Sequence, residues 1–300
     1  PVDIDFREFP AGDSVLEERG TALPEDTLQG AREADAVLLG AVGETAADVV
    51  IRLRQELDTF VNLRPIKAYP GVDCVDPSAD FVIVRENTEC LYAGIENEIA
   101  PGVTTATRVI TEHASKRIAK YAYDYAESEG RSLVSTIHKN NVLPLTGGEF
   151  LKAANEVADE YDIESEDVLV DAAALYLVKD PERFEVLLTT NLFGDILSDL
   201  AAGLIGGLGL SPSANIGDEH GLFEPVHGTA PDIAGKGIVN PTAALLSSSY
   251  LLKFLDEPEM GKELESAVEE TLASGETTPD LGGDLSTMKM ADSVLEKLSL

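Results

Sequence analysis

The sequence has few basic residues, no tryptophan and only two cysteines. Lysine and arginine together number 22 against 55 aspartates and glutamates in 300 residues, giving a net charge of −33. A surface of this charge repels nucleic acid and anionic membranes, so neither is expected as a partner. Cys74 and Cys90 form no CxxC pair and suggest no disulfide framework, which favours a reducing cytoplasm.

Long apolar runs are also absent, and no stretch reaches the roughly 18 residues that predict a transmembrane helix. The hydrophobic content of 44% nevertheless suffices for a large core. The acidic residues are spread along the chain. They form either an ordinary solvated surface or one adapted to a cytoplasm of very high salt, where screening removes the self-repulsion.

Short β-rich runs alternate with helical patterns, which predicts an α/β fold with a mainly parallel sheet. The predicted strands are Ala36–Gly40, Phe81–Arg85, Leu133–Ile137, Val168–Asp171 and Val186–Thr189, and the chain opens on a strand-like run, Val2–Phe6. The predicted helices are Ala46–Leu57, Glu112–Glu129, Glu149–Tyr161, Asp195–Leu204, Pro241–Leu255 and Met260–Ser274. The segment 92–110 breaks the alternation, and either a protruding antiparallel arm or a plain surface hairpin fits it.

Three carboxylates stand in apolar surroundings. Asp195 and Asp199 are four residues apart and share one helical face, while Asp171 closes an apolar run. With no cysteine or histidine nearby, they suit a hard metal such as Mg²⁺ or Mn²⁺. Helix capping and exposed faces are the alternative explanation.

Basic residues in partly apolar patterns suggest a polyanionic substrate. Arg54, Arg64 and Arg85 could bind carboxylates in bidentate fashion, although each alone could equally be an ion-pair partner. Lys139 follows a predicted strand, where a lysine beside a metal can act as a base. No glycine-rich Rossmann fingerprint is present, but Asp232, in a tight loop, could accept the ribose hydroxyls of an adenosine.

Taken together, these motifs resemble those of the β-decarboxylating dehydrogenases, which act on 3-isopropylmalate, isocitrate, homoisocitrate, tartrate or D-malate. The motifs are NLRP (Asn62–Pro65), RENTE (Arg85–Glu89), HKNN (His138–Asn141), VDA (Val170–Ala172), NLFGDILSD (Asn191–Asp199), IGD (Ile216–Asp218), EPVHGTAPDIAGKG (Glu224–Gly237), NP (Asn240–Pro241) and TPDLGG (Thr278–Gly283).

The resemblance implies a two-lobed fold with a shared mixed sheet. Residues 1–59 and 206–300 would form the larger, NAD-binding lobe, and residues 60–205 the smaller lobe with the dimer interface, the arm and the metal aspartates. The assembly would be a homodimer with shared active sites, and a tetramer stays open. The strand and glycine loop with which family members begin are expected before Pro1 and are absent from the sequence.

The resemblance also implies roles for individual residues. Arg54, Arg64 and Arg85 would hold substrate carboxylates, and Tyr92 would protonate the product enol. Lys139 would take the hydroxyl proton in the partner subunit's site. Asp171, likewise from across the dimer, would join Asp195 and Asp199 on Mg²⁺ or Mn²⁺. The residues expected to bind NAD are Asn141, Glu224, His227, Gly228, Thr229, Ala230, Asp232, Ile233 and Asn240.

The resemblance also implies that substrate choice depends on the residues one helical turn before Arg54. Val50 and Ile51 are apolar there, which favours 3-isopropylmalate and hence leucine biosynthesis, with isocitrate or homoisocitrate as the alternative if Arg52 turns inward. Asp232 would repel a 2′-phosphate, which favours NAD over NADP. Two alternatives without catalysis remain. A regulatory subunit of the same fold should lack Tyr92, Lys139 or one of the three aspartates. A structural metal-binding protein would show no turnover.

The net charge generates a first testable prediction. Self-repulsion at −33 should destabilise the fold in dilute buffer, so the melting temperature should rise steeply as KCl approaches molar concentration. Calorimetric scans over a KCl series measure this, and a flat response would remove the high-salt interpretation.

Overall fold

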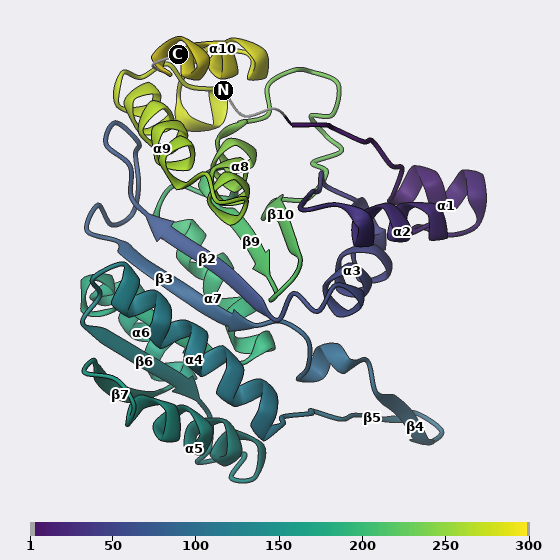
Figure 1. Cartoon of the computed structure of the whole chain (residues 1–300), viewed down its shortest axis with the longest axis vertical. Coiled ribbons are helices and arrows are strands. Elements are labelled where there is room, and N and C mark those ends of the chain that lie inside the picture. The colour runs from purple at the N-terminus through teal and green to yellow at the C-terminus, as the bar shows by residue number, and fades with distance from the viewer. Residues whose placement is uncertain (1–3, 299–300) are drawn as a thin grey trace.

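An eight-stranded mixed sheet runs through the whole molecule (Figure 1). The structure is a computed structural model that describes residues 4–298. The strands lie in the order β1-β10-β9-β2-β3-β8-β6-β7. Their bounds are β1 (Val37–Leu38), β2 (Val61–Lys67), β3 (Asp80–Glu86), β6 (Leu133–His138), β7 (Glu164–Leu169), β8 (Val186–Thr189), β9 (Pro212–Ile216) and β10 (Gly221–Pro225). Parallel pairs join β3, β8, β6 and β7, whereas β2 and β9 pair antiparallel with their neighbours.

Helices cover both faces of this sheet. One apolar cluster packs α6, α7, α9 and α10 onto one face, and a second packs α4 and α5 onto the other, with α8 contributing to both. A third cluster packs α2 and the helix before β2 together at one end (Figure 1). The helices are α1 (Asp13–Arg19), α2 (Glu25–Glu33), η2 (Ala47–Ile51, a π-helical turn), α3 (Arg52–Glu56), α4 (Glu112–Ser128), α5 (Thr146–Ala158), α6 (Val170–Lys179), α7 (Asn191–Leu204), α8 (Thr242–Phe254), α9 (Pro258–Ala273) and α10 (Thr287–Lys297).

Strand β3 shows why the sheet needs helices on both sides. Phe81 and Ile83 enter the cluster beneath α7, while Val82 and Val84 enter the cluster beneath α4. A continuous apolar run is expected for a strand buried on both faces. Since side chains alternate between the faces, Arg85 points to the same side as Ile83, towards α7.

The predicted α/β fold is confirmed, but two of the predicted strands need correction. The strand predicted at Val168–Asp171 ends at Leu169, and Asp171 lies in the first turn of α6. Periodicity cannot separate a short buried strand from the start of a buried helix, so the boundary between β7 and α6 could not be predicted from the apolar run. In the run Val2–Phe6, the first two residues lie outside the described part, and residues 4–6 form no strand.

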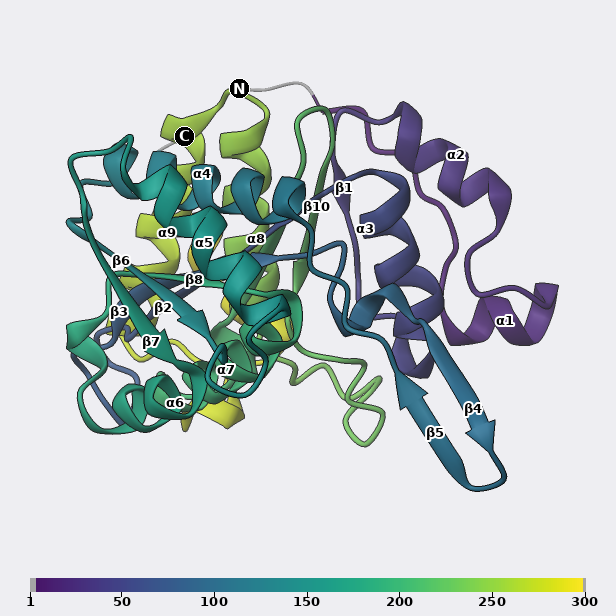
Figure 2. The same ribbon diagram turned by 90° about the horizontal axis from the view of Figure 1, so that it is seen from below.

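The segment predicted as an arm is a protruding antiparallel hairpin (Figure 2). It consists of β4 (Glu96–Ala100) and β5 (Val103–Ala106), and every residue of both strands is exposed. The alternative of a hairpin lying on the surface is therefore wrong. Among the described residues, no helix combines the length and apolarity needed to span a membrane.

Helix α7 packs closely on β3 because residue 194 is a glycine. A Cβ added to Gly194 would lie 2.6 Å from Cγ and 2.7 Å from Cβ of Arg85. Any side chain here would push the helix away from the strand that holds Arg85.

Gly194→Ala should therefore lower the free energy of unfolding by about 1–3 kcal/mol through overpacking. Gly203→Ala on the same helix is the matched control, because a Cβ there meets nothing within 4 Å and alanine has the higher helix propensity by up to about 1 kcal/mol. Urea denaturation measures both. Equal stability of the two variants would contradict the close approach.

Candidate active site

Arg85, at the end of β3, is almost entirely buried, at 1% exposure. Its Nε and Nη2 donate to Oδ1 of Asn191, at 3.1 and 2.7 Å, and its Nη1 donates to Oδ1 of Asp195 at 2.5 Å. The guanidinium also lies 5.2 Å from the centre of the Tyr92 ring. Helix α7 therefore supplies both the amide and the carboxylate that hold this cation in place.

Tyr92 joins the same cluster, since its hydroxyl donates to Oδ2 of Asp195 at 2.6 Å. Burial raises the pKa of Tyr92, and the bond to Asp195 raises it further, so the phenol keeps its proton at neutral pH. Burial alone would raise the pKa of Asp195 as well. The charge of Arg85 and the bond from Tyr92 outweigh that effect and hold this pKa below its usual value.

Two more arginines lie buried beside Arg85. Arg64 of β2 donates from Nε to Oδ1 of Asn62 at 2.7 Å, and Arg54 of α3 donates from Nη2 to Oε1 of Glu224 at 2.9 Å. Burial, together with the charges of Arg85 and Arg54, lowers the pKa of Arg64 to about 10.

Two of the arginines have donors without a hydrogen-bond partner in residues 4–298. Nη1 of Arg64 and Nε of Arg54 are buried without a hydrogen-bond partner among the described residues. Buried polar groups are normally paired, so unpaired guanidinium donors mark a place for an anion. These arginines do not line the cavity of about 400 Å³ whose walls include Tyr121, Tyr125 and Tyr250.

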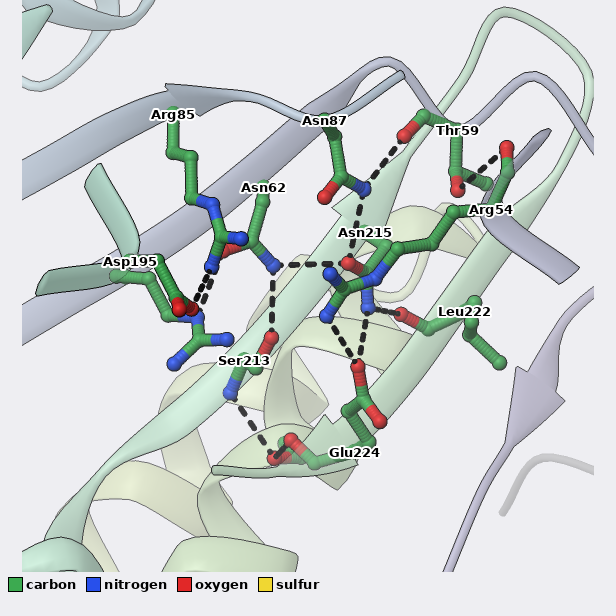
Figure 3. Close-up of polar contacts among 12 residues, drawn as sticks. Arg54, Thr59, Asn62, Arg85, Asn87, Asp195, Ser213, Asn215, Leu222 and Glu224 are labelled. Atoms are coloured by element: carbon green, nitrogen blue, oxygen red, sulfur yellow. Dashed lines mark hydrogen bonds and ion pairs between the residues drawn. The ribbon is translucent and has the colours of Figure 1, made fainter. Parts of the chain in front are cut away.

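Asparagine amides connect the arginines beneath the site (Figure 3). Oδ1 of Asn215 on β9 accepts from Asn62 at 2.8 Å and from Asn87 at 3.0 Å. Its Nδ2 donates to the carbonyl of Leu222 at 2.9 Å and to Glu224 at 3.0 Å. All four hydrogen-bonding positions of this amide are thus used.

Lys139 and Asp171 lie apart from this cluster and contact each other. The lysine ammonium, just after β6, pairs with the carboxylate in the first turn of α6. This bond lowers the pKa of Asp171. Within one chain the structure therefore brings Arg54, Arg64 and Arg85 together with Tyr92 and Asp195, but not with Lys139 or Asp171.

The metal site predicted from three aspartates is only partly present in the described residues. No group of three or more histidine, cysteine, aspartate or glutamate side chains that could hold a metal occurs in residues 4–298. Asp195 and Asp199 do share one face of α7. Burial and the charge of Asp195 raise the pKa of Asp199. A divalent cation would relieve this repulsion, so the donor pair fits a hard metal that takes a further ligand from elsewhere.

The predicted NAD-binding residues lie mostly in an irregular segment that directly follows β10, whose last two residues are Glu224 and Pro225. Ala230 has a φ of 43°, a left-handed conformation that is uncommon for alanine. Gly228, Thr229 and Asp232 are exposed, whereas His227 and Ile233 are partly buried.

Two predicted NAD contacts lie outside that loop or at its end. Asn240 donates to Asp280 at 3.1 Å and accepts from the backbone of Thr242 at 3.0 Å, which fixes the end of the loop. Asn141 is exposed in the turn after Lys139. Like Lys139, it lies apart from the arginine cluster.

The residues before Arg54 point in different directions. Val50 is partly buried against the cluster at the end of the sheet, and Ile51 lines a shallow hollow together with Leu16 of α1. Arg52 approaches Glu25 at 3.7 Å.

Comparison with known proteins agrees with this site. The family "Isocitrate/isopropylmalate dehydrogenase" matches residues 1–294. The 3-isopropylmalate/3-methylmalate dehydrogenase of Methanocaldococcus jannaschii is 57% identical over 99% of this chain and 91% of its own. The isocitrate/homoisocitrate dehydrogenase of Thermus thermophilus is 49% identical over 99% and 90%. The crystal structure of isocitrate dehydrogenase from Methylococcus capsulatus superposes with a TM-score of 0.92 at 45% identity, covering 97% of this chain and 89% of that one.

The partners of Arg85 yield a prediction that separates its hydrogen bonds from its packing. Asn191→Leu removes both bonds to a buried charge and should cost about 2–3 kcal/mol of unfolding free energy. Asn191→Asp keeps an acceptor and, at the first residue of α7, suits the helix dipole, so its loss should be smaller. Denaturation at neutral pH measures the difference. Equal losses would show that the amide only fills space.

Proposed function

The chain belongs to the isocitrate/isopropylmalate dehydrogenase family and is an NAD-dependent decarboxylating dehydrogenase, and from this premise we propose that its substrate is 3-isopropylmalate. The products are 2-oxoisocaproate and CO₂, with Mg²⁺ or Mn²⁺ as the metal, and the reaction belongs to leucine biosynthesis. The higher identity to the isopropylmalate relative than to the isocitrate/homoisocitrate relative supports this choice.

The observation that carries the proposal is the apolar residue on the helical face of Arg54. Val50 is four residues before Arg54, so both side chains lie on the same face. Burying the three carbons of an isopropyl group beside valine contributes about 2 kcal/mol, whereas an unpaired carboxylate there costs several. Arg52, which could pair with such a carboxylate, is engaged with Glu25, and Ile51 faces α1. The specificity argument thus depends on Val50.

The residues of the site suit oxidation followed by decarboxylation. NAD would supply the hydride acceptor, and a divalent metal held by Asp195 and Asp199 would supply positive charge to stabilise the developing negative charge on oxygen. The arginines hold the two carboxylates, and Lys139 of the partner subunit takes the proton of the 2-hydroxyl. When the C3 carboxylate leaves as CO₂, its bonding electrons remain on C3, and Tyr92 donates a proton there. The raised pKa of Tyr92 means that the phenol carries its proton before this step.

Exposed apolar side chains support a homodimer with shared sites. Leu145, in the segment after Lys139, is 85% exposed, Ile196 of α7 is 56% exposed and Leu175 of α6 is 55% exposed. Large exposed apolar side chains are typical of association surfaces. Lys139 and Asp171 lie on the same elements, so a twofold partner could receive both. We place the lobes at residues 1–59 with 206–300 and at residues 60–205.

The test of the substrate is kcat/KM for isopropylmalate, isocitrate, homoisocitrate and D-malate, with NAD and Mg²⁺ in high KCl. Isopropylmalate should be preferred at least tenfold, the value expected from about 1.4 kcal/mol of differential binding. Val50→Ser should reduce that preference without altering the KM for NAD. A tenfold preference for isocitrate or homoisocitrate would overturn the proposal.

Shared sites can be tested with two inactive variants. Lys139→Ala and Asp195→Asn should each lower kcat greatly while leaving NAD affinity nearly unchanged. In a mixed dimer, one of the two sites then lacks both residues and the other retains both, so mixing and refolding the variants should restore activity. The same treatment of either variant alone is the control. No recovery in the mixture would argue against shared sites.

A further inference from the structure

We infer that Asn215 is a positioning residue that fixes Arg54 and Arg64 relative to each other. The inference rests on the proposed function, since those arginines are its carboxylate-binding groups. Asn215 is itself fully buried and belongs to a chain of side-chain hydrogen bonds, here called the amide relay, that runs Arg64–Asn62–Asn215–Glu224–Arg54. Figure 3 shows this relay from Asn62 to Arg54.

The register of the sheet creates this relay. Arg85 on β3 lies opposite Asn62 on β2, Asn62 lies opposite Asn215 on β9, and Asn215 lies opposite Leu222 on β10. Directly opposed residues on one face have Cβ atoms about 5 Å apart, close enough for short side chains to bond. The row crosses four strands, and it joins β2 and β3 to β10, the strand that carries Glu224.

The direction of every bond in the relay follows from its ends. A guanidinium only donates, so Asn62 must turn its oxygen to Arg64 and its nitrogen to Asn215. Asn215 must then accept on Oδ1, which leaves Nδ2 to donate to Glu224. Oε1 of Glu224 then accepts from both Asn215 and Arg54. A break at Asn215 leaves Arg64 on Asn62 and Arg54 on Glu224, but it removes the link that holds one pair in place relative to the other.

Only a neutral amide satisfies these requirements at position 215. Oδ1 receives two N–H donors and Nδ2 serves two acceptors, so the side chain needs two donors and two acceptors. An aspartate would have no donor and would place a second negative charge against Glu224, which raises the shared pKa of the pair. Below that pKa, the pair would hold one proton and the bond between them would form again.

The test compares Asn215→Leu and Asn215→Asp with the wild type in the isopropylmalate assay. Asn215→Leu should raise the KM for isopropylmalate about tenfold to a hundredfold, the effect expected of arginines misplaced by about 1 Å, and change kcat much less. At high pH, Asn215→Asp should have a KM similar to that of Asn215→Leu. As the pH falls, its KM should return most of the way to the wild-type value measured at the same pH. Asn215→Leu should show no such recovery.

Ser213→Ala is the matched control. It removes another fully buried hydrogen bond of the same strand, from Asn62 at 2.9 Å, but leaves the relay intact. It should lower the melting temperature and leave the KM within twofold. If Asn215→Leu behaves in the same way, or if Asn215→Asp has a KM that does not depend on pH, the role is structural and the inference is overturned.

Crystal structures of the variants test the amide relay independently of the proposed function. If the wild type oxidises none of the hydroxy acids, the proposed function fails. The guanidinium groups of Arg54 and Arg64 should still be displaced by about 1 Å in Asn215→Leu and unmoved in Ser213→Ala. Unmoved arginines would refute the relay. If Asn215→Leu does not fold, the pH dependence of Asn215→Asp decides alone.

Discussion

The molecule is organised around the burial of three guanidinium groups next to one another. Desolvation is the main reason why the pKa values of Arg64 and Arg85 are lowered, and each cation also repels the others. Buried charge is tolerated only with partners. Asp195 and Glu224 supply two negative charges, and asparagine amides supply the remaining acceptors. The compensation is incomplete, and the donors left unpaired are the ones that a substrate with two carboxylates can use.

This constraint explains features of the fold that packing alone does not require. The register of β2, β9 and β10 sets the amides in one row. Gly194 lets α7 come close enough for its carboxylate to reach Arg85. Because α7 also presents Asp199 on the same face, one helix holds the buried arginine and two of the predicted metal ligands. Helix α7 thus holds the cation of Arg85 and carries the carboxylates of Asp195 and Asp199.

The sequence predicted the parts of this site that have recognisable residue types in recognisable motifs. Arg54, Arg64, Arg85 and Asp195 were found because charged residues in apolar patterns are conspicuous. Asn191 and Asn215 received no role, although Asn191 opens a quoted motif. An asparagine in a strand or a helix start has many ordinary explanations, and its importance here comes from cross-strand register, which pattern alone does not give. The strand predicted to reach Asp171 failed for a related reason, since its apolar run fits either the end of a strand or the start of a helix.

The folding of the β4–β5 hairpin should depend on the concentration of the protein. An isolated two-stranded hairpin is only marginally stable in water, and each residue of these strands faces solvent in the single chain. Its order would therefore be supplied largely by whatever covers it. If a second subunit does so, association and arm folding form one equilibrium, and dilution would melt the arm and separate the subunits together. Hydrogen exchange in residues 96–106 would then report subunit concentration, while exchange in β3 would not.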